Sequence, residues 1–507
     1  MRKILVSIIA CLALLLVPVV ALAGCKKDSN SEEKQEQVIK YSVTFVAEGR
    51  TSVVTVEEGK TVKKPTNPTK NGYTFDGWYT DENYTTKWKF TNKVTGDLTL
   101  YAKFVEDVEP IVEYNVVFEL NNGTSQETTI ASGALIERPA DPTKNGYNFD
   151  TWYSDPSFTT LYNFNSPVTG NVTLYANYCD ANLTMGTVTF GTGYARVMDC
   201  NEAATSVVIP SAYRGYRVQE INRGAFEDCF VLTSVVIPEG VKTISIDAFN
   251  GCEKLASITI PSTVESIMSG AFCYCSGLTS IVVANGNQTF DSRNNCNAII
   301  RTETNELVLG CKSTVIPNTV TSIGANAFLV CDFETITIPA SVETIGACAF
   351  SSCSNLTSVT IPATVTALGN QAFYRCSKLS TVTFTNNSQL QTIGDSAFED
   401  CAVLTSFAIP DGVETISDGA FSDCEELVYL IIPASVTEIE HSATFFCTKL
   451  DKIYYKGNST QWGQITVGTM NSIEDATVYF YSEEEPDLAG NYWHYDNDGV
   501  TPVVWEI

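Results

Sequence analysis

The chain has 507 residues, 18% of them charged and 44% hydrophobic, so it is long enough for several domains and too apolar to be disordered. Its 31 Lys and Arg against 58 Asp and Glu give a formal net charge of −27. A chain this acidic is repelled by phosphate backbones and by anionic lipid surfaces, which argues against nucleic acid as a partner.

Residues 1–25 are predicted to be an export signal. Arg2 and Lys3 precede an apolar run that ends in the tetrapeptide Leu22–Cys25. This ending resembles a bacterial lipobox, and the resemblance implies cleavage before Cys25 and lipid attachment to its thiol, which would anchor the protein to the membrane. An uncleaved membrane-spanning anchor is the alternative, because the run is nearly long enough to cross a bilayer. On either interpretation the rest of the chain lies outside the cytoplasm.

Residues 26–40 are rich in charge and lack aromatic side chains, so they are predicted to be a flexible linker. Two similar segments follow at 41–106 and 113–179, and both contain the pattern Gly-Tyr-x-Phe-Asp-x-Trp-Tyr, at Gly72–Tyr79 and Gly146–Tyr153. The pattern resembles internalin-type B-repeats, which are small β-grasp-like modules of bacterial surface proteins, and this implies a spacer. The aromatic side chains are interpreted as each module's core, with a ligand platform as the alternative.

A repeated Ala-Phe-x-x-Cys motif organises the chain after these two segments. Its cysteines recur every 22–25 residues apart from one gap of 56. A period in the twenties is typical of a leucine-rich-repeat solenoid. Each repeat also has a short alternating strand that ends at proline, such as Val235 and Ile237 before Pro238. The motif cysteines are Cys229, Cys252, Cys275, Cys331, Cys353, Cys376, Cys401, Cys424 and, in a degraded copy, Cys447.

Stacked coils project equivalent side chains in parallel, so the motif's Phe and Cys are predicted to form columns in the core. Parallel side chains have poor geometry for a disulfide, and the cysteines in the column are interpreted as buried apolar residues. Glycines three residues before Ala-Phe are predicted to let the chain turn there. These are Gly324, Gly346, Gly369 and Gly394.

The repeat reads L-x-x-[IV]-x-I-P-x-x-V-x-x-I-x-x-x-A-F-x-x-C and resembles the BspA-like leucine-rich repeat family over about residues 184–480. The resemblance implies a mainly β solenoid of short parallel strands with short helical turns over 184–455, and a hairpin insertion is predicted at about 284–312. Members of the family are typically surface-exposed bacterial proteins, and some are adhesins that bind host matrix proteins or other cells.

The insertion contains a candidate disulfide. If its hairpin turns at Thr302–Asn305, Ile299 faces Val308 and Cys296 faces Cys311. Opposed residues of an antiparallel pair have Cα atoms about 4.5–5.5 Å apart, which is within the disulfide range of roughly 4.4–6.8 Å. Cys296 and Cys311 are therefore predicted to be able to form a disulfide, with two free thiols as the alternative.

Alternate strand residues are predicted to face solvent on the concave side as two uncharged columns. One column is Ser206, Ser234, Ser257, Ser280, Ser313, Thr335, Ser358, Thr381 and Ser406. The other is Val208, Val236, Thr259, Val282, Val315, Thr337, Thr360, Thr383 and Ala408. In the last two coils the positions become large, at Tyr429, Ile431 and Tyr454. These three residues are a candidate partner-binding site, with packing beneath the C-terminal segment as the alternative.

Residues 456–507 are predicted to cap the last coil with aromatic side chains, with a sugar-binding shelf as the alternative. The two histidines, His441 and His494, lie in no spacing that suits a metal or a catalytic triad. The sequence therefore predicts no catalytic residue, no metal and no cofactor.

These features predict a monomeric, non-catalytic cell-surface binding or adhesion protein that presents its solenoid to host matrix proteins, cells or glycans. The alternative is an extracellular solute- or polysaccharide-binding lipoprotein or an enzyme accessory subunit. A solute-binding protein would need two α/β lobes around a cleft, and no alternation of strands and helices is visible here.

Overall fold

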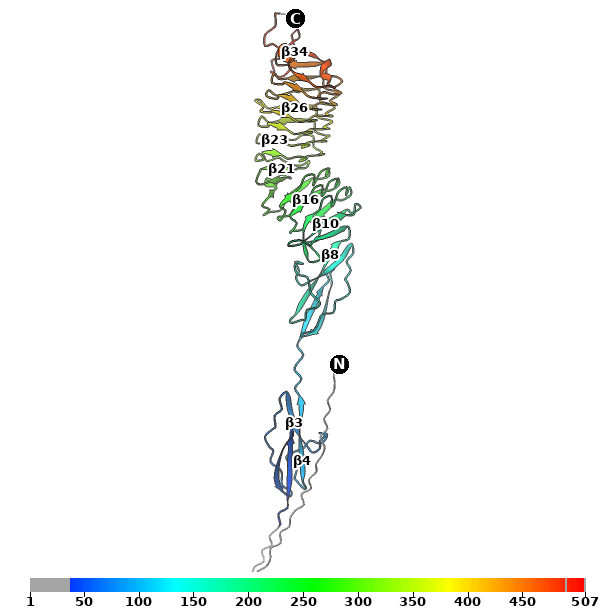
Figure 1. The fold of residues 1–507 in the computed structure, drawn as a ribbon, viewed down its shortest axis with the longest axis vertical. Helices are drawn as coiled ribbons and strands as arrows, with labels where there is room; N and C mark the ends of the chain where they lie inside the picture. The colour runs from blue at the N-terminus through cyan, green and yellow to red at the C-terminus, as the bar shows by residue number, and fades with distance from the viewer. Residues whose placement is uncertain (1–36, 488–489, 506–507) are drawn as a thin grey trace, which may run out of the picture. The chain divides into compact units, whose positions relative to one another are not determined.

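The computed structural model describes residues 37–487 and 490–505, so the predicted export signal with Cys25 and most of the linker lie outside the described residues. The chain divides into two compact units, Met1–Ile111 and Val112–Ile507 (Figure 1). No helix in the described part of the chain is both long and apolar enough to cross a bilayer.

The first unit holds one four-stranded sheet. Its strands run in the order β2-β1-β4-β3, with β1 parallel to β4 and the other pairs antiparallel. Phe45, Trp78 and Leu100 are buried on one face of this sheet, so the interpretation of the aromatic residues as core is confirmed. The strands are β1 (Lys40–Ala47), β2 (Arg50–Glu57), β3 (Tyr73–Tyr79) and β4 (Leu98–Glu106).

The second unit begins with a module of the same topology, in the order β6-β5-β8-β7. Phe118, Trp152 and Leu174 take the buried positions here. The strands are β5 (Glu113–Glu119), β6 (Ser125–Ala131), β7 (Tyr147–Tyr153) and β8 (Val172–Asp180). Below, the sheet of β1–β4 is called repeat module 1 and that of β5–β8 repeat module 2.

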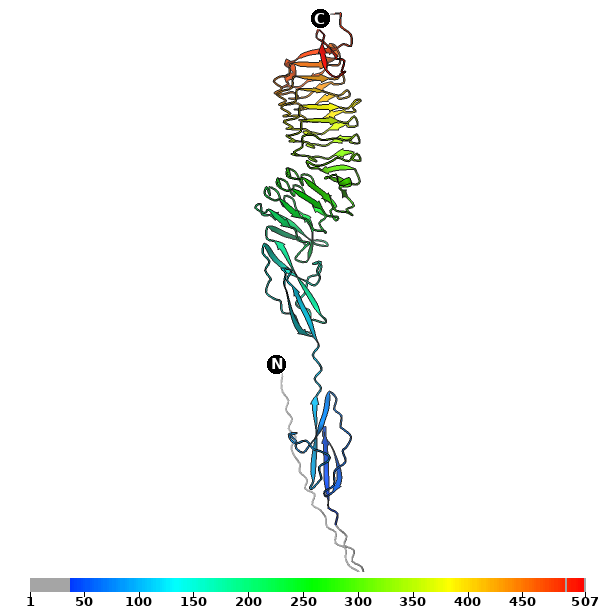
Figure 2. The same cartoon turned by 180° about the vertical axis from the view of Figure 1, so that it is seen from behind.

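The rest of the second unit is a solenoid, so the predicted fold class is confirmed. Each regular coil has a strand before its proline, a shorter strand after it, and then the Ala-Phe-x-x-Cys motif as a series of turns (Figures 1 and 2). Equivalent strands of successive coils pair in parallel, for example Ser358–Ile361 with Thr381–Phe384. The inward-facing apolar side chains of both strands and of the motif are almost all buried.

The first strand series is β11 (Ser206–Val208), β14 (Ser234–Val236), β16 (Ser257–Ile260), β18 (Ser280–Val283), β24 (Ser358–Ile361), β26 (Thr381–Phe384), β28 (Ser406–Ala408), β30 (Tyr429–Ile432), β32 (Lys452–Tyr455) and β34 (Thr477–Tyr481). The second series is β13 (Tyr216–Ile221), β15 (Thr243–Ile244), β17 (Ser266–Ile267), β22 (Ser322–Ile323), β23 (Thr344–Ile345), β25 (Ala367–Leu368), β27 (Thr392–Ile393), β29 (Thr415–Ile416), β31 (Glu438–Ile439) and β33 (Thr466–Val467).

The solenoid begins with the antiparallel pair β9 (Leu183–Val188) and β10 (Tyr194–Cys200), and β12 (Ala212–Tyr213) forms a hairpin with β13. At the other end β34 pairs with β32, so the sheet continues one coil past residue 455. The antiparallel pair β35 (Tyr492–Tyr495) and β36 (Pro502–Val504) then closes it. The helices are short: η1 (Arg293–Asn295), α1 (Ser459–Trp462) and η2 (Ser472–Asp475).

The motif side of each coil needs left-handed backbone at two places. One is the residue before Ala and the other is the residue before Cys, such as Cys348 at φ 55° and Ser352 at φ 58°. The predicted turning role of the four glycines is wrong, because none of them has a positive φ. They permit close approach instead: a Cβ on Gly346 would lie 2.7 Å from the Ala325 backbone nitrogen of the preceding coil.

The insertion divides the solenoid into two arrays. The second-series sheet runs to β17 and stops, and a separate sheet starts with the insertion strands β19 (Phe290–Asp291), β20 (Ile299–Arg301) and β21 (Glu306–Leu309) before continuing through β22. The buried side chains form two clusters that divide at the same place. The stacking of the motif phenylalanines is also interrupted between Phe272 and Phe328.

Candidate functional site

The motif cysteines form the predicted column, buried in every copy except at the partly exposed Cys331, and each thiol of the C-terminal array also has a hydrogen-bond acceptor. Cys353 Sγ donates to Phe328 O at 3.1 Å, and Cys376 Sγ donates to Phe350 O at 3.2 Å. Burial raises the pKa of the Cys376 thiol from its ordinary value of 9.0 to about 12. The interpretation of these residues as free thiols in the core is confirmed, and the thiol donor adds a reason for the choice of cysteine.

The predicted disulfide of the insertion is corrected by the structure. The hairpin forms, but Ile299 pairs with Leu309 rather than with Val308, because a β-bulge leaves Val308 without a partner. The shift moves the residues beyond it out of the predicted register. Cys296 and Cys311 are both buried free thiols.

The two predicted solvent-facing columns are confirmed, since each of their members is exposed or partly exposed. Four valines stand out in the second column, with 41%, 55%, 45% and 74% of their surfaces exposed. They are Val208, Val236, Val282 and Val315. In the C-terminal array the same column is Thr337, Thr360, Thr383 and Ala408, so the valines are confined to the N-terminal coils and the start of the second array. The two columns together are called the outward strand face.

Two of the three candidate binding residues at the end of the solenoid are buried, and the third is partly buried. Ile431 is 3% exposed and Tyr454 is 5% exposed, and Tyr429 is partly buried. They pack with Trp493, whose indole Nε1 donates to Tyr455 O at 3.0 Å. The prediction of a binding site there is therefore wrong, because β35 and β36 cover the large side chains that the last coils would otherwise expose.

Repeat module 2 is joined to the solenoid by the partly buried carboxylate of Asp150. Both oxygens of Asp150 accept from Arg214 N at 3.1 Å, in the turn between β12 and β13. Tyr153 OH and Asn177 Nδ2 also donate to Asp150 Oδ2, each at 3.1 Å. Gly215 N donates to Tyr153 OH at 2.9 Å. Burial raises the pKa of the Asp150 carboxyl above its ordinary value, because desolvation disfavours the charged form.

The corresponding carboxylate of repeat module 1 has different neighbours. Asp76 accepts from Lys87 Nζ at 2.8 Å, and Lys103 Nζ lies 4.0 Å from it. The Lys87 hydrogen bond lowers the pKa of Asp76. In module 2 the residues 74 positions later are Leu161 and Asn177. The sequence reasoning missed this joint, and the loss of both lysines from the second copy was the signal for it.

The described residues hold no group of three or more His, Cys, Asp or Glu side chains positioned for a metal ion. His441 Nδ1 lies 2.9 Å from Thr469 Oγ1, and His494 stacks on Trp505 with ring centroids 3.9 Å apart. Neither histidine is hydrogen-bonded to a serine, a cysteine or a carboxylate among the described residues.

Known families match both parts of the chain. The Listeria-Bacteroides repeat domain matches residues 41–103 and 114–177. The BspA type leucine rich repeat region matches residues 199–303, 299–390 and 385–481.

Two relatives of known sequence share shorter stretches. Internalin H of Listeria monocytogenes is 40% identical over 143 residues, which are 27% of this chain and 25% of that protein. A Gly-rich membrane protein of Evansella cellulosilytica is 36% identical over 178 residues, which are 34% of this chain and 20% of that protein. The chain thus spans at most a quarter of the length of these two relatives.

Solved structures with a similar fold include a leucine rich cell surface protein from Faecalibacterium prausnitzii, 23% identical, with a TM-score of 0.38 over 57% of this chain and 97% of that one. A leucine-rich repeat protein from Eubacterium ventriosum is 18% identical, with a TM-score of 0.42 over 62% of this chain and 99% of that one. Both TM-scores are below 0.5, so the assignment rests on the repeat sequence. Since that sequence covers more than half of its residues, the chain belongs to the BspA type leucine rich repeat family and carries two Listeria-Bacteroides repeat domains ahead of the solenoid.

Proposed function

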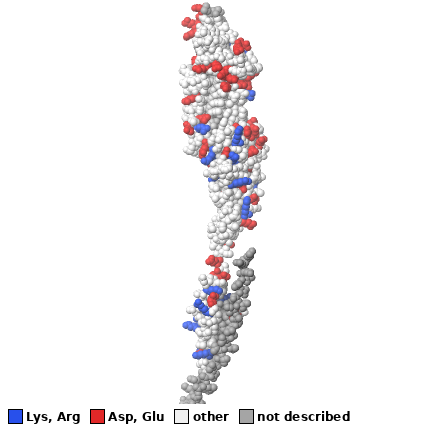
Figure 3. All heavy atoms as spheres, viewed as in Figure 1, with Lys and Arg blue, Asp and Glu red and all other residues white. Residues whose placement is uncertain are grey.

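We propose that the protein is a non-catalytic binding protein of the cell surface, anchored through a lipid on Cys25, whose solenoid contacts an extracellular protein or glycan. The observation that carries the proposal is the outward strand face, which is uncharged along its two columns although the whole chain has a net charge of −27. Figure 3 shows acidic and basic side chains scattered among broad uncharged areas.

An uncharged face of small side chains suits contact with a partner for a physical reason. Burying Ser, Thr and Val removes no ionised group from water, and hydroxyl groups can exchange their water for the partner's polar atoms. The exposed valines add apolar area where the N-terminal coils lie. The two repeat modules are proposed as spacers, and the relatives described as an internalin and a membrane protein agree with a place at the membrane.

The test is a binding screen with the soluble chain 26–507 against extracellular matrix proteins and a glycan array. The variants Val236→Glu and Val282→Glu place a carboxylate on the outward strand face, and each is expected to weaken binding about tenfold or more. Val403→Glu is the matched control, because Val403 has a similar exposure of 39% but lies outside the two columns.

Equal binding by all three variants would place the contact elsewhere on the molecule. Failure of the chain to bind any matrix protein or glycan in the screen would contradict the proposed function itself. Circular dichroism and thermal unfolding of the variants establish that a change in binding does not come from a change in folding.

A further inference from the structure

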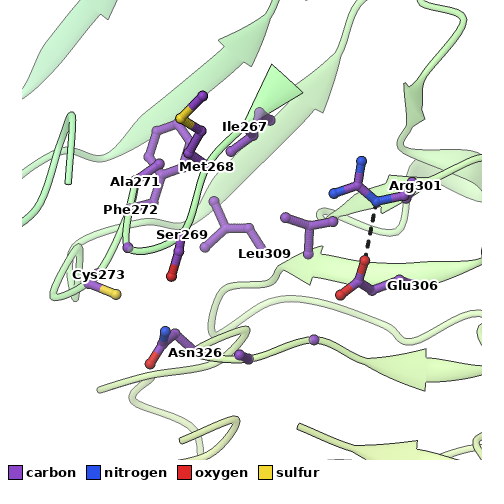
Figure 4. Close-up of a pocket in the computed structure, with 14 residues that line it drawn as sticks. Ile267, Met268, Ser269, Ala271, Phe272, Cys273, Arg301, Glu306, Leu309 and Asn326 are labelled. Atoms are coloured by element: carbon purple, nitrogen blue, oxygen red, sulfur yellow. Dashed lines mark hydrogen bonds and ion pairs between the residues drawn. The ribbon is translucent and has the colours of Figure 1, made fainter. Parts of the chain in front are cut away.

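A cavity of about 200 Å³ lies where the two arrays of the solenoid meet. Ile267, Phe272 and Leu309 give it an apolar lining. At its edge Arg301 Nε lies 3.2 Å from Glu306 Oε2. Figure 4 shows the residues from Ile267 to Cys273 on one side and the Arg301–Glu306 pair on the other.

One wall of the cavity is the last coil of the N-terminal array. This coil lacks the backbone hydrogen bonds that join the other coils to their neighbours. In seven coils, three alternate backbone N–H groups of the motif side donate to the next coil. In one of them Cys348 N donates to Asn370 O, Phe350 N to Ala372 O and Ser352 N to Tyr374 O.

The equivalent N–H groups of the interrupted coil belong to Gly270, Phe272 and Tyr274. None of the three has an acceptor among the described residues. Gly270 and Phe272 line the cavity. The break thus leaves unused backbone donors beside an apolar surface.

The first coil after the break, on the other side of the cavity, has unused hydrogen-bond acceptors. In regular coils three backbone carbonyl groups accept hydrogen bonds from the preceding coil. They belong to the motif alanine and to the residues two positions before it and two positions after it. In the first coil after the break only the middle one is used, because Gly310 N donates to Ala327 O at 2.8 Å. Ala325 O accepts no backbone hydrogen bond from the described residues, and Ala325 lines the cavity.

We propose that this break is a binding site for an extended polypeptide segment of a partner protein. Carbonyl groups on one edge of an extended strand alternate with the same two-residue period as the N–H groups of Gly270 and Phe272. The segment's own N–H can donate to Ala325 O. One side chain of the segment then rests on Ile267, Phe272 and Leu309.

This mode of recognition has consequences for the partner. Main-chain hydrogen bonds supply affinity with little dependence on sequence, and the cavity selects one small or aliphatic side chain. Flanking basic residues fit best, because the field of a chain with a net charge of −27 attracts cations. The site is formed by the second strand series and the motif, whereas the outward strand face is formed by the first strand series. The two surfaces differ, so this proposal can be tested separately from the proposed function.

The experiment is amide hydrogen exchange with and without a millimolar probe peptide. The probe is a capped hexapeptide in which two valines and two threonines alternate between terminal lysines. In the wild-type chain, exchange in the segment containing Gly270 and Phe272 is expected to slow about fivefold or more with the peptide. The segment containing Phe350, whose N–H is already bonded within the stack, is the internal reference and should not change.

Two variants and a modified peptide make the test specific. Ala325→Trp fills the cavity and is expected to abolish the peptide-dependent protection. Ala347→Trp is the matched control, because Ala347 is the equivalent exposed residue one coil later and does not line the cavity. A peptide methylated on its backbone nitrogens should lose the effect. No protection in the wild type, equal protection in Ala325→Trp, or full protection by the methylated peptide would overturn the proposal.

Discussion

Cys376 Sγ donates a hydrogen bond to Phe350 O in the preceding coil at 3.2 Å, and that carbonyl oxygen also accepts from Cys353 N of its own coil at 3.3 Å. The thiol therefore fills apolar space and occupies the second acceptor position of a buried carbonyl. Alanine at this position would leave a void and would lack the thiol donor, and valine would also lack the donor. This dual role accounts for cysteine in the seven motif copies whose thiol donates to the Phe carbonyl of the preceding coil.

We expect Cys376→Ala to destabilise the solenoid by about 1–2 kcal/mol, through lost apolar burial and the loss of one acceptor's partner. The measurement is the midpoint of urea unfolding followed by circular dichroism. Cys348→Ala is the control, because Cys348 is partly exposed and lies outside the column. An equal loss from the two variants would contradict a special role for the column.

The thiol column should also make stability fall in alkaline solution. The folded-state pKa of Cys376 is about 12, above its ordinary value of 9.0. A raised folded pKa means that the native state holds the thiol proton more tightly than the unfolded state does. The contribution of the protonated thiol to the free energy of unfolding is therefore complete below pH 9 and is lost as the pH rises to 12. The stability difference between wild type and Cys376→Ala should therefore shrink across that window. A constant difference would show that Cys376 does not titrate with unfolding.

The repeat made much of this fold predictable from sequence. A fixed period identifies the coil, and alternation within it separates Val235, which is buried, from Val236, which faces solvent. The insertion register was not predictable, because a bulge at Val308 adds one residue to one strand without any sequence mark. The repeat alone could not decide whether Tyr454 binds a partner or packs beneath the C-terminal segment, because its cover comes from β35 and β36, which lie outside the repeat.

The joint between repeat module 2 and the solenoid gives a prediction about coupling. Asp150→Ala leaves the N–H of Arg214, the Tyr153 hydroxyl and the Asn177 amide without their shared acceptor. We expect it to lower the stability of the second unit by about 2–4 kcal/mol, because the buried Tyr153 hydroxyl and Asn177 amide lose this acceptor. Differential scanning calorimetry measures the loss.

Asp76→Ala is the matched control for Asp150→Ala, because Asp76 holds the same place in repeat module 1. There the partner groups are the Tyr79 hydroxyl and two lysines that water can solvate, so the unfolding temperature of the first unit should fall less than that of the second. A larger loss from Asp76→Ala than from Asp150→Ala would contradict the assignment of Asp150 as a joint.

The cap over the last coils gives a fourth prediction. Trp493→Ala should cost about 3–5 kcal/mol, because the indole is fully buried and its removal opens a cavity beside Tyr454 and Ile431. Tyr454→Ala should lower the unfolding temperature as well, whereas a surface binding residue would not. Trp505→Ala is the control, since Trp505 is only partly buried. Unchanged unfolding temperatures for Trp493→Ala and Tyr454→Ala would show that the cap contributes nothing to the stack.

The last prediction concerns the anchor proposed at Cys25, which lies outside the described residues. A lipid is attached through the cysteine thiol, so Cys25→Ser removes the acceptor while preserving the size of the side chain. We expect the variant to remain as the longer precursor without acyl chains, whereas the wild type is cleaved before residue 25 and acylated, as the masses of the two proteins would show. Cys200→Ser controls for the general effect of losing a thiol, because Cys200 is buried in the solenoid. Cleavage and acylation of Cys25→Ser to the same extent as in the wild type would refute the lipid anchor at the Cys25 thiol.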